Sequence, residues 1–201
     1  MLPESTQVAL KEWAVACSAL DQGRQVILLR KGGIHEDGLD FRVIHDQFVL
    51  YPSYEHQKPG LVKPEWQAEL AATFANAPPS TEIRFTHFAK VTSLVEIMEQ
   101  ERLDRLDALH LWTAGYAQQR LHWKPRRPLT VMFIRAYRIR PVTVPFLGEY
   151  AGCTSWVPLA QGVPLDGLVP VLTDEDYQRQ ADQVMRALDA GAPSSVSAAS
   201  R

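Results

Sequence analysis

The segment Leu129–Ile139, LTVMFIRAYRI, carries the strongest β-strand pattern in the chain. Among its first six residues, Thr130 supplies the single polar side chain. A short, nearly continuous apolar run indicates a strand buried on both faces, whereas a strand with one wet face alternates apolar and polar residues. We therefore expect Leu129–Ile139 to occupy a central position in a sheet.

Other short apolar runs, separated by turn residues, predict further strands. These are Gln25–Arg30, Phe41–His45, Gln47–Tyr51 and Arg84–Ile97, with one or two short strands around Thr154–Val157. The charged sequence His35–Gly38 predicts a turn between the first two runs. Several strands joined by tight turns are typical of a meander or a small barrel.

Helical patterns surround these strands. The apolar spacing predicts a helix that begins at Ser5 or Thr6 and ends at Gly23, with Cys17 on its packed face. Further helices are predicted over Pro64–Ala77, over Leu103–His122 with a break near Asp107, and over Asp174–Leu188 with Thr173 as cap. The sequence thus predicts an α+β protein with a small curved mixed or antiparallel sheet, or barrel, and flanking helices.

The composition is that of an ordinary globular domain. The chain has 201 residues, 46% of them hydrophobic, and a formal net charge of -2. We expect one domain over residues 1–190 and a disordered Ser/Ala-rich tail over 191–201. The sequence shows neither a signal-peptide pattern nor an apolar run of about 18 residues, so we expect a cytoplasmic protein without a membrane partner. No pattern in the sequence sets the oligomeric state.

Metal and cofactor motifs are missing from the sequence. The two cysteines, Cys17 and Cys153, form no CxxC pair, and the six histidines show no HExxH or HxH spacing. The sequence also contains no GxGxxG or GK[ST] phosphate loop and no GxSxG nucleophile elbow. We therefore assign no catalytic residue, no metal site and no cofactor.

A run of basic residues is the first feature that could carry a function. Between Ala108 and Gly148 there are seven Lys or Arg residues and no acid: Arg120, Lys124, Arg126, Arg127, Arg135, Arg138 and Arg140. Arg side chains bind phosphates with a two-pronged fork, so the run could be a nucleic-acid surface. The alternative is that these arginines pair with the acidic helices and form a solvated face.

Aromatic residues are interleaved with this basic run. Trp112, Tyr116 and Trp123 recur at helical spacing, with Tyr137 and Trp156 further along. Helical spacing normally indicates core packing. The alternative is that one or two of these rings line a pocket in which a base stacks, while Arg120 or Lys124 holds the adjacent phosphate.

Two groups of residues resemble a known family. One group runs from Leu29-Arg30-Lys31-Gly32-Gly33-Ile34 to Leu50-Tyr51-Pro52-Ser53-Tyr54-Glu55-His56-Gln57. The other includes His110-Leu111-Trp112-Thr113, Trp123-Lys124-Pro125, Arg135-Ala136-Tyr137-Arg138 and Gly152-Cys153-Thr154-Ser155-Trp156-Val157. On these motifs the chain resembles the bacterial family called domain of unknown function 1802, over roughly Leu10–Leu188.

The resemblance implies little about activity. Some members of that family are joined to a restriction-type endonuclease domain, which implies a nuclease partner and a place in DNA defence. A looser resemblance links the chain to PUA-like domains, including the ASCH and EVE groups. Those domains are small curved sheets that bind RNA or modified bases.

These observations predict a non-catalytic module that recognises nucleic acid or a modified base. The predicted nucleic-acid contacts are Arg120, Trp123, Lys124, Arg126, Arg127 and Arg135, and the predicted base pocket is formed by Tyr51, His56, Trp112 and Trp156. A first alternative is a hydrolase or nuclease-like enzyme that acts on nucleotides or phosphoesters through a cleft of histidines and Cys153. A second alternative is a protein-interaction subunit.

Overall fold

The computed structural model describes residues 3–31, 43–152 and 154–190. Its strands are β1 Ser5–Trp13, β2 Ile27–Arg30, β3 Gln47–Ser53, β4 Glu82–Ile97, β5 Leu129–Pro145, β6 Trp156–Pro164 and β7 Val169–Pro170. Its α-helices are α1 Ala14–Asp21, α2 Gln67–Ala75, α3 Gln100–Asp104, α4 Ala114–His122 and α5 Asp174–Asp189. Short 3-10 turns lie at Pro59–Leu61, Pro64–Trp66, Asp107–Leu109 and Gly148–Tyr150. The predicted turn His35–Gly38 and the predicted tail 191–201 lie outside the described residues.

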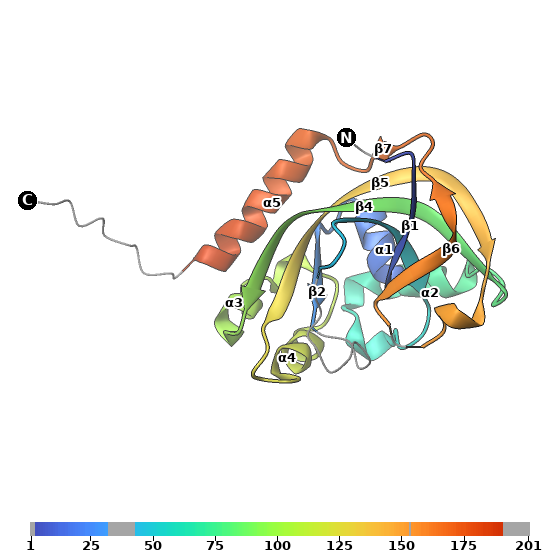
Figure 1. Ribbon diagram of the computed structural model, residues 1–201. Helices are drawn as coiled ribbons and strands as arrows, with labels where there is room; N and C mark the ends of the chain where they lie inside the picture. Colours follow the sequence, from blue (N-terminus) through green and yellow to red (C-terminus); the bar gives the residue numbers. More distant parts are fainter. Residues whose placement is uncertain (1–2, 32–42, 153, 191–201) are drawn as a thin grey trace, which may run out of the picture.

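The strands form one mixed sheet in the order β2-β5-β4-β3-β1-β6, with β7 paired to β5. The β1–β3 pair is parallel and the other pairs are antiparallel. β4 and β5 make a long curved arch, and α1 lies beneath it (Figure 1). The predicted α+β class, with a curved sheet and flanking helices, is therefore confirmed; the described strands do not close into a barrel.

β5 has the interior position that its apolar run predicts. Its first residues pair with β2 on one side and β4 on the other, so that Val131 lies between Leu29 and Val95. Both faces of this part of the strand are covered, and every side chain from Leu129 to Ile134 is buried. β5 also continues to Pro145, beyond the predicted end at Ile139.

The predicted N-terminal helix is wrong over its first half. Ser5–Trp13 is strand β1, and the helix begins only at Ala14. β1 lies between β3 and β6, which accept and donate its main-chain hydrogen bonds on both sides. The apolar spacing of Leu10, Trp13 and Cys17 fits a helix, but pairing with two neighbouring strands overrides this local pattern. The predicted strand at Phe41–His45 is also not found in its described part, residues 43–45.

Strand alternation divides the core into two clusters on opposite faces of the sheet. Phe48 and Leu50 of β3 belong to the larger cluster, which also contains residues of α1, α4 and α5. Val49 and Tyr51 of β3 belong to the second cluster, which strands β1, β3, β4, β5 and β6 build. Neighbouring residues of β3 therefore face different compartments, as the two-residue period of a strand requires.

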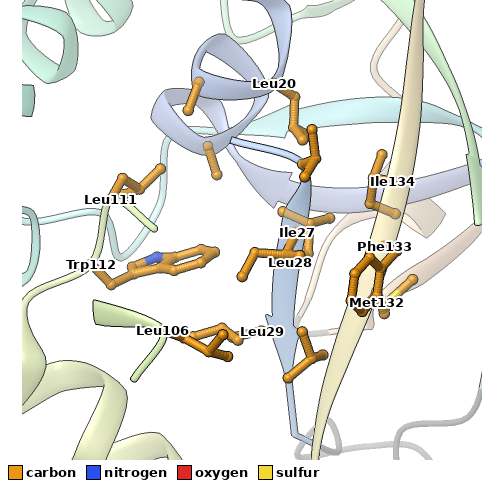
Figure 2. Close-up of a cluster of buried hydrophobic side chains, with 14 of the residues drawn as sticks. Leu20, Ile27, Leu28, Leu29, Leu106, Leu111, Trp112, Met132, Phe133 and Ile134 are labelled. Carbon is orange, nitrogen blue, oxygen red and sulfur yellow. The ribbon is translucent and has the colours of Figure 1, made fainter. Parts of the chain in front are cut away.

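The predicted helix Leu103–His122 is broken into separate pieces. The segment between α3 and α4 is extended at Trp112, which forms an isolated bridge with Val62. Main-chain bonds from Lys63 N to Leu111 O and from Thr113 N to Leu61 O fix this segment at 2.9 and 3.0 Å. Trp112 is thereby inserted into the larger core cluster, where its indole ring points toward β2 (Figure 2).

The last helix agrees closely with its prediction. α5 begins after Thr173, whose hydroxyl accepts a hydrogen bond from Asp176 N at 3.0 Å. Three acidic residues in its first turn suit the positive end of the helix dipole. Among the residues that the structure describes, no helix is both long enough and apolar enough to span a membrane.

Candidate functional site

A cleft of about 510 Å³ opens where the ends of β1 and β2, the segment after β3, helix α4 and the segment before β6 meet. Small-molecule sites typically occupy roughly 300–1,000 Å³. Its main lining residues are Lys11, Glu12, Trp13, Arg30, Lys31, Ser53, Glu55, His56, Trp112, Tyr116, Arg120, Trp123, Thr154 and Ser155. Because these residues come from distant parts of the sequence, only the folded chain assembles the cleft.

Aromatic rings form part of the cleft wall. Trp13, at the end of β1, stacks on Tyr116 of α4 with ring centroids 5.1 Å apart and planes inclined by 27°. Trp123 follows α4 and has the Lys124 ammonium group 4.7 Å from its ring centroid. Trp112 is only 3% exposed, so it supports the wall from the core side. The aromatic surface open to a ligand is therefore that of Trp13, Tyr116 and Trp123, which are half-buried.

Glu12 and Arg30 form an ion pair in the cleft lining. Arg30 Nη1 lies 3.0 Å from Glu12 Oε2, and both side chains are largely buried. The other carboxylate oxygen of Glu12 accepts a hydrogen bond from Trp13 N at 2.8 Å. A buried carboxylate is tolerated only when it is paired and hydrogen-bonded, so Arg30 is chiefly committed to Glu12.

The two lysines of the cleft donate to main-chain carbonyls. Lys31 is buried and its ammonium group donates to Leu121 O, in the last turn of α4. Burial, assisted by the charge of Arg120, lowers the pKa of Lys31 below its ordinary value. Lys11 donates to Tyr150 O and, at 2.9 Å, to Gly152 O. Both ammonium groups thus hold the walls of the cleft in place.

The hydrogen bonding of Arg120 differs from that of Lys11, Arg30 and Lys31 in the same cleft. Its guanidinium group has five N–H donors, yet within the described residues its one hydrogen bond is to Lys31 O, at 3.5 Å. Burial lowers the pKa of Arg120 below its ordinary value, and the charge of Arg30 acts in the same direction. A desolvated guanidinium with unused donors in a cleft is a site that attracts an anion.

Tyr116 lies one helical turn before Arg120, so both side chains emerge from the same face of α4. The Tyr116 hydroxyl has no hydrogen-bond partner in the part of the chain that the structure describes. Burial raises the pKa of Tyr116, so the hydroxyl stays protonated and remains able to donate. The Tyr116 hydroxyl therefore adds a neutral hydrogen-bond donor beside the Arg120 guanidinium.

The cleft brings together four of the residues predicted for the site: His56, Trp112, Arg120 and Trp123. Tyr51 and Trp156, predicted for the pocket, do not line it. Tyr51 points to the opposite face of β3, where its ring lies 6.0 Å from that of Phe85. Trp156 packs edge-on against Phe48, with ring centroids 5.1 Å apart.

The basic run does not act as one surface. Arg135 is 5% exposed, and its Nη2 lies 2.7 Å from Asp174 Oδ1 at the start of α5. Arg138 Nε lies 2.5 Å from Asp21 Oδ1. Each of these guanidinium groups forms an ion pair with an aspartate. We therefore do not propose Arg135 as a nucleic-acid contact. Lys124, Arg126 and Arg127 lie in the exposed loop between α4 and β5, next to Trp123.

The histidines that the structure describes are dispersed. His87 Nε2 bonds Asp21 at 2.8 Å, and His122 Nε2 bonds Gln100 at 3.0 Å, both away from the cleft. His45 packs against Trp156, and His110 is buried beside Trp112. Only His56 of the described histidines lines the cleft. His35 lies outside the described residues.

The thiol and metal chemistry can be stated for the described ranges. Cys17 is a free, buried thiol, and burial raises its pKa well above its ordinary value, so it is a packing residue. Cys153 lies outside the described residues. No three His, Cys, Asp or Glu side chains within the described ranges come together as metal ligands.

Two unusual backbone conformations occur beside the cleft. His56 and Lys124 have φ angles of 64° and 50°, and they are the two non-glycine residues with positive φ in the described ranges. His56 lines the cleft, and Lys124 follows Trp123 directly. Such conformations are costly for residues with a Cβ atom and cluster at ligand sites. Both therefore support a function for this cleft.

Sequence reasoning missed the cleft residues that come from β1 and β2. Lys11, Glu12 and Trp13 fell within a predicted helix, and Arg30 and Lys31 were seen only as a strand end and part of a family motif. A usable signal existed, because Lys11 and Glu12 place two charges directly after the short apolar run Val8–Leu10. The aromatic spacing includes Tyr116 but does not by itself assign it to the site.

The fold and the cleft define an α+β protein with a curved mixed sheet and one aromatic, cationic cleft at the strand ends. The chain belongs to the family described as Domain of unknown function (DUF1802), whose family model matches residues 9–183. A search of the curated proteins finds no match.

Two solved structures of ZmASCH from Zymomonas mobilis are similar to the chain. A serine-to-alanine mutant of that protein has 12% sequence identity and a TM-score of 0.40, over 90% of this chain and 98% of that one. A tyrosine-to-phenylalanine mutant has 11% identity and a TM-score of 0.41, over 87% and 96%.

Proposed function

We propose that this protein recognises nucleic acid by taking one nucleotide into the cleft. The base stacks on the aromatic wall of Trp13, Tyr116 and Trp123, and Arg120 binds the adjacent phosphate. The observation that carries this proposal is the state of Arg120, a half-buried guanidinium whose one described hydrogen bond is 3.5 Å long. Apart from this bond the guanidinium lies 5.7 Å from the ring centroid of Trp123. Burying a cation with few hydrogen bonds is costly, and a phosphate would supply more of them.

The energies of such a contact are adequate for recognition. Stacking of a base on an aromatic side chain contributes about 1–3 kcal/mol, and a hydrogen bond to a charged group contributes about 1.5–3 kcal/mol. Extruding a base from a duplex costs a few kcal/mol. The cleft is therefore expected to favour single strands or bases that are already unpaired.

The rim of the cleft supplies weaker contacts. Lys124 and Arg126 are exposed in the loop that follows Trp123. In the proposed complex they contact phosphates of the strand next to the bound nucleotide, and such contacts depend on salt because they release counterions. Arg127 of the same loop, also exposed, belongs to this rim.

Binding of labelled oligonucleotides tests the proposal. Fluorescence anisotropy is measured at low salt with single-stranded DNA, single-stranded RNA and duplex DNA. Arg120→Gln should weaken binding by about tenfold or more, while Arg140→Gln, which removes an exposed charge from a residue that does not line the cleft, should not. Equal binding by the two variants would reject the cleft as the site, and no binding by the wild-type protein would reject the function.

A hydrolase that acts on nucleotides is the second candidate. It is favoured by His56, which lines the cleft in a left-handed conformation beside Glu55, with the Ser53 and Ser155 hydroxyls in the same lining. Incubation of the wild-type protein with oligonucleotides and nucleotides, followed by mass spectrometry, tests this candidate. A product that His56→Gln abolishes would favour the enzyme, and unchanged ligands would favour recognition alone.

A further inference from the structure

We infer that the cleft recognises a nucleotide by a terminal phosphomonoester, so that its ligand is a mononucleotide or the phosphorylated end of a strand. This inference rests on the proposed function and names the ligand class of the same site. Three features of the described cleft support it: its charge, its unused hydrogen-bond donors and its size.

The charge of the cleft lining matches a phosphomonoester. Among the residues that the structure describes, four cations line it, namely Lys11, Arg30, Lys31 and Arg120, against the two carboxylates Glu12 and Glu55. The difference, four minus two, is a formal charge of +2. A phosphomonoester carries about -1.5 to -2 at pH 7, whereas each phosphodiester of a continuous strand carries only -1. A single terminal phosphate therefore neutralises the cleft more completely than an internal one.

The unused donors also match a terminal phosphate. Arg120 can present a two-pronged fork to two oxygens, and the Tyr116 hydroxyl emerges from the same face of α4 and can donate to a third. A phosphomonoester has three terminal oxygens, while a phosphodiester has two. Since neither side chain has another strong partner within the described residues, both are available to the ligand.

The size and borders of the cleft favour one nucleotide over a continuing strand. The volume of the cleft is about 510 Å³. The hydrogen bonds from Lys31 to Leu121 O and from Lys11 to Gly152 O fix the positions of its walls. The next cations along the basic run, Arg135 and Arg138, are paired with Asp174 and Asp21. Within the described part of the basic run, the exposed cations nearest the cleft in sequence are therefore those of the rim loop that follows Trp123, which suits a strand that ends inside the cleft.

The wild-type protein alone provides the first test. Binding is compared for one single-stranded oligonucleotide carrying a 5′-phosphate, a 3′-phosphate or hydroxyls at both ends, with nucleoside monophosphates, nucleosides and inorganic phosphate as competitors. One phosphorylated end should bind about tenfold or more tightly than the hydroxyl form, the fold-change expected for one additional hydrogen bond between charged groups. A monophosphate should compete better than its nucleoside and better than inorganic phosphate.

Variants locate the effect. Arg120→Gln and Arg120→Lys should both reduce the preference for the phosphorylated end, because Lys keeps the charge but loses the fork. Tyr116→Phe should reduce it in part, and Arg140→Gln should preserve it. Circular dichroism and thermal unfolding establish that each variant is folded.

The outcomes separate the inference from the proposed function. Equal binding of phosphorylated and hydroxyl ends would overturn the inference and leave nucleic-acid recognition standing. Competition by inorganic phosphate as strong as that of a monophosphate would overturn the nucleotide part of the inference. If neither an oligonucleotide nor a nucleoside monophosphate binds at low salt, both proposals are overturned.

Discussion

Trp13 and Tyr116 stack with their ring centroids 5.1 Å apart, and this contact joins the end of β1 to helix α4. The two residues also line the cleft together. An aromatic pair of this kind contributes about 0.5–1.5 kcal/mol beyond its buried area. The contact therefore stabilises the fold and at the same time shapes the surface on which we propose that a base stacks.

The two roles of Tyr116 can be separated by substitution. Tyr116→Ala should lower the free energy of unfolding by about 2 kcal/mol, because it removes the ring that supports Trp13. Tyr116→Phe keeps the ring, and the lost hydroxyl has no partner among the described residues, so the change should stay within about 0.5 kcal/mol. Urea unfolding of both variants measures the difference. A destabilisation by Phe as large as that by Ala would contradict the assignment of the hydroxyl to the ligand.

Arg135 is predicted to be a structural residue and not a nucleic-acid contact. Its guanidinium donates to Thr173 O at 3.1 Å and to Asp174 Oδ1 at 2.7 Å, and so holds the start of α5. Arg135→Gln should lower the free energy of unfolding by about 2 kcal/mol and leave the salt dependence of oligonucleotide binding unchanged. Arg126→Gln, at an exposed position, is the matched control and should change stability by less than about 0.5 kcal/mol. Equal free energies of unfolding for the two variants would mean that the pairing of Arg135 with α5 does not stabilise the fold.

The parts of the fold that sequence predicted are those whose local signal agrees with their tertiary position. Residues 129–134 of β5 are almost all apolar and are buried inside the sheet, and α5 has both a capping threonine and an acidic first turn. The helix predicted at the start of the chain is wrong because Ser5–Trp13 forms main-chain hydrogen bonds with β3 and β6, which are distant in sequence. The spacing of apolar residues within Ser5–Trp13 carries no information about those two partner strands.

Of the four predicted site residues that line the cleft, three lie close together in sequence and His56 comes from another part of the chain. Trp112, Arg120 and Trp123 lie in or beside α4, so the basic and aromatic spacing found them. Tyr51 and His56 are close in sequence, but the alternation of β3 sends Tyr51 to the opposite core cluster. Lys11, Glu12, Arg30 and Lys31 come from β1 and the end of β2, and only the folded sheet brings them to α4.

Stability should fall on acidification because of one buried histidine. Burial, assisted by the charge of Lys63, lowers the pKa of His110 from 6.5 to about 4. Between pH 6.5 and pH 4, His110 is protonated in the unfolded chain but stays neutral in the folded chain. The stabilisation from a depressed pKa is thus complete above pH 6.5 and is lost as the pH falls toward 4, by up to about 3 kcal/mol.

The variant His110→Phe isolates this effect. Phe keeps an aromatic ring beside Trp112 and removes the titrating group. Urea unfolding at pH 7, 6 and 5 should show a smaller loss of stability with falling pH for the variant than for the wild-type protein. Parallel curves for the two proteins would assign the acid sensitivity to the carboxylates instead.

The rim and the wall of the cleft should affect binding in different ways. Lys124 and Arg126 are exposed, and each phosphate contact contributes about -0.9 to the slope of log affinity against log salt on duplex DNA, or about -0.7 on single strands. Changing both to Gln should reduce the magnitude of the slope on single strands by up to about 1.4, with a modest loss of affinity at high salt. Trp123→Ala should instead weaken single-strand binding by about 1–3 kcal/mol at every salt concentration, because stacking releases no counterions. Anisotropy titrations at several salt concentrations, with Arg140→Gln as the charge control, separate the two effects. A Trp123→Ala variant that loses affinity only at low salt, and so has a smaller slope, would mean that the ring only positions the neighbouring Lys124, whose ammonium group lies 4.7 Å from the ring centroid.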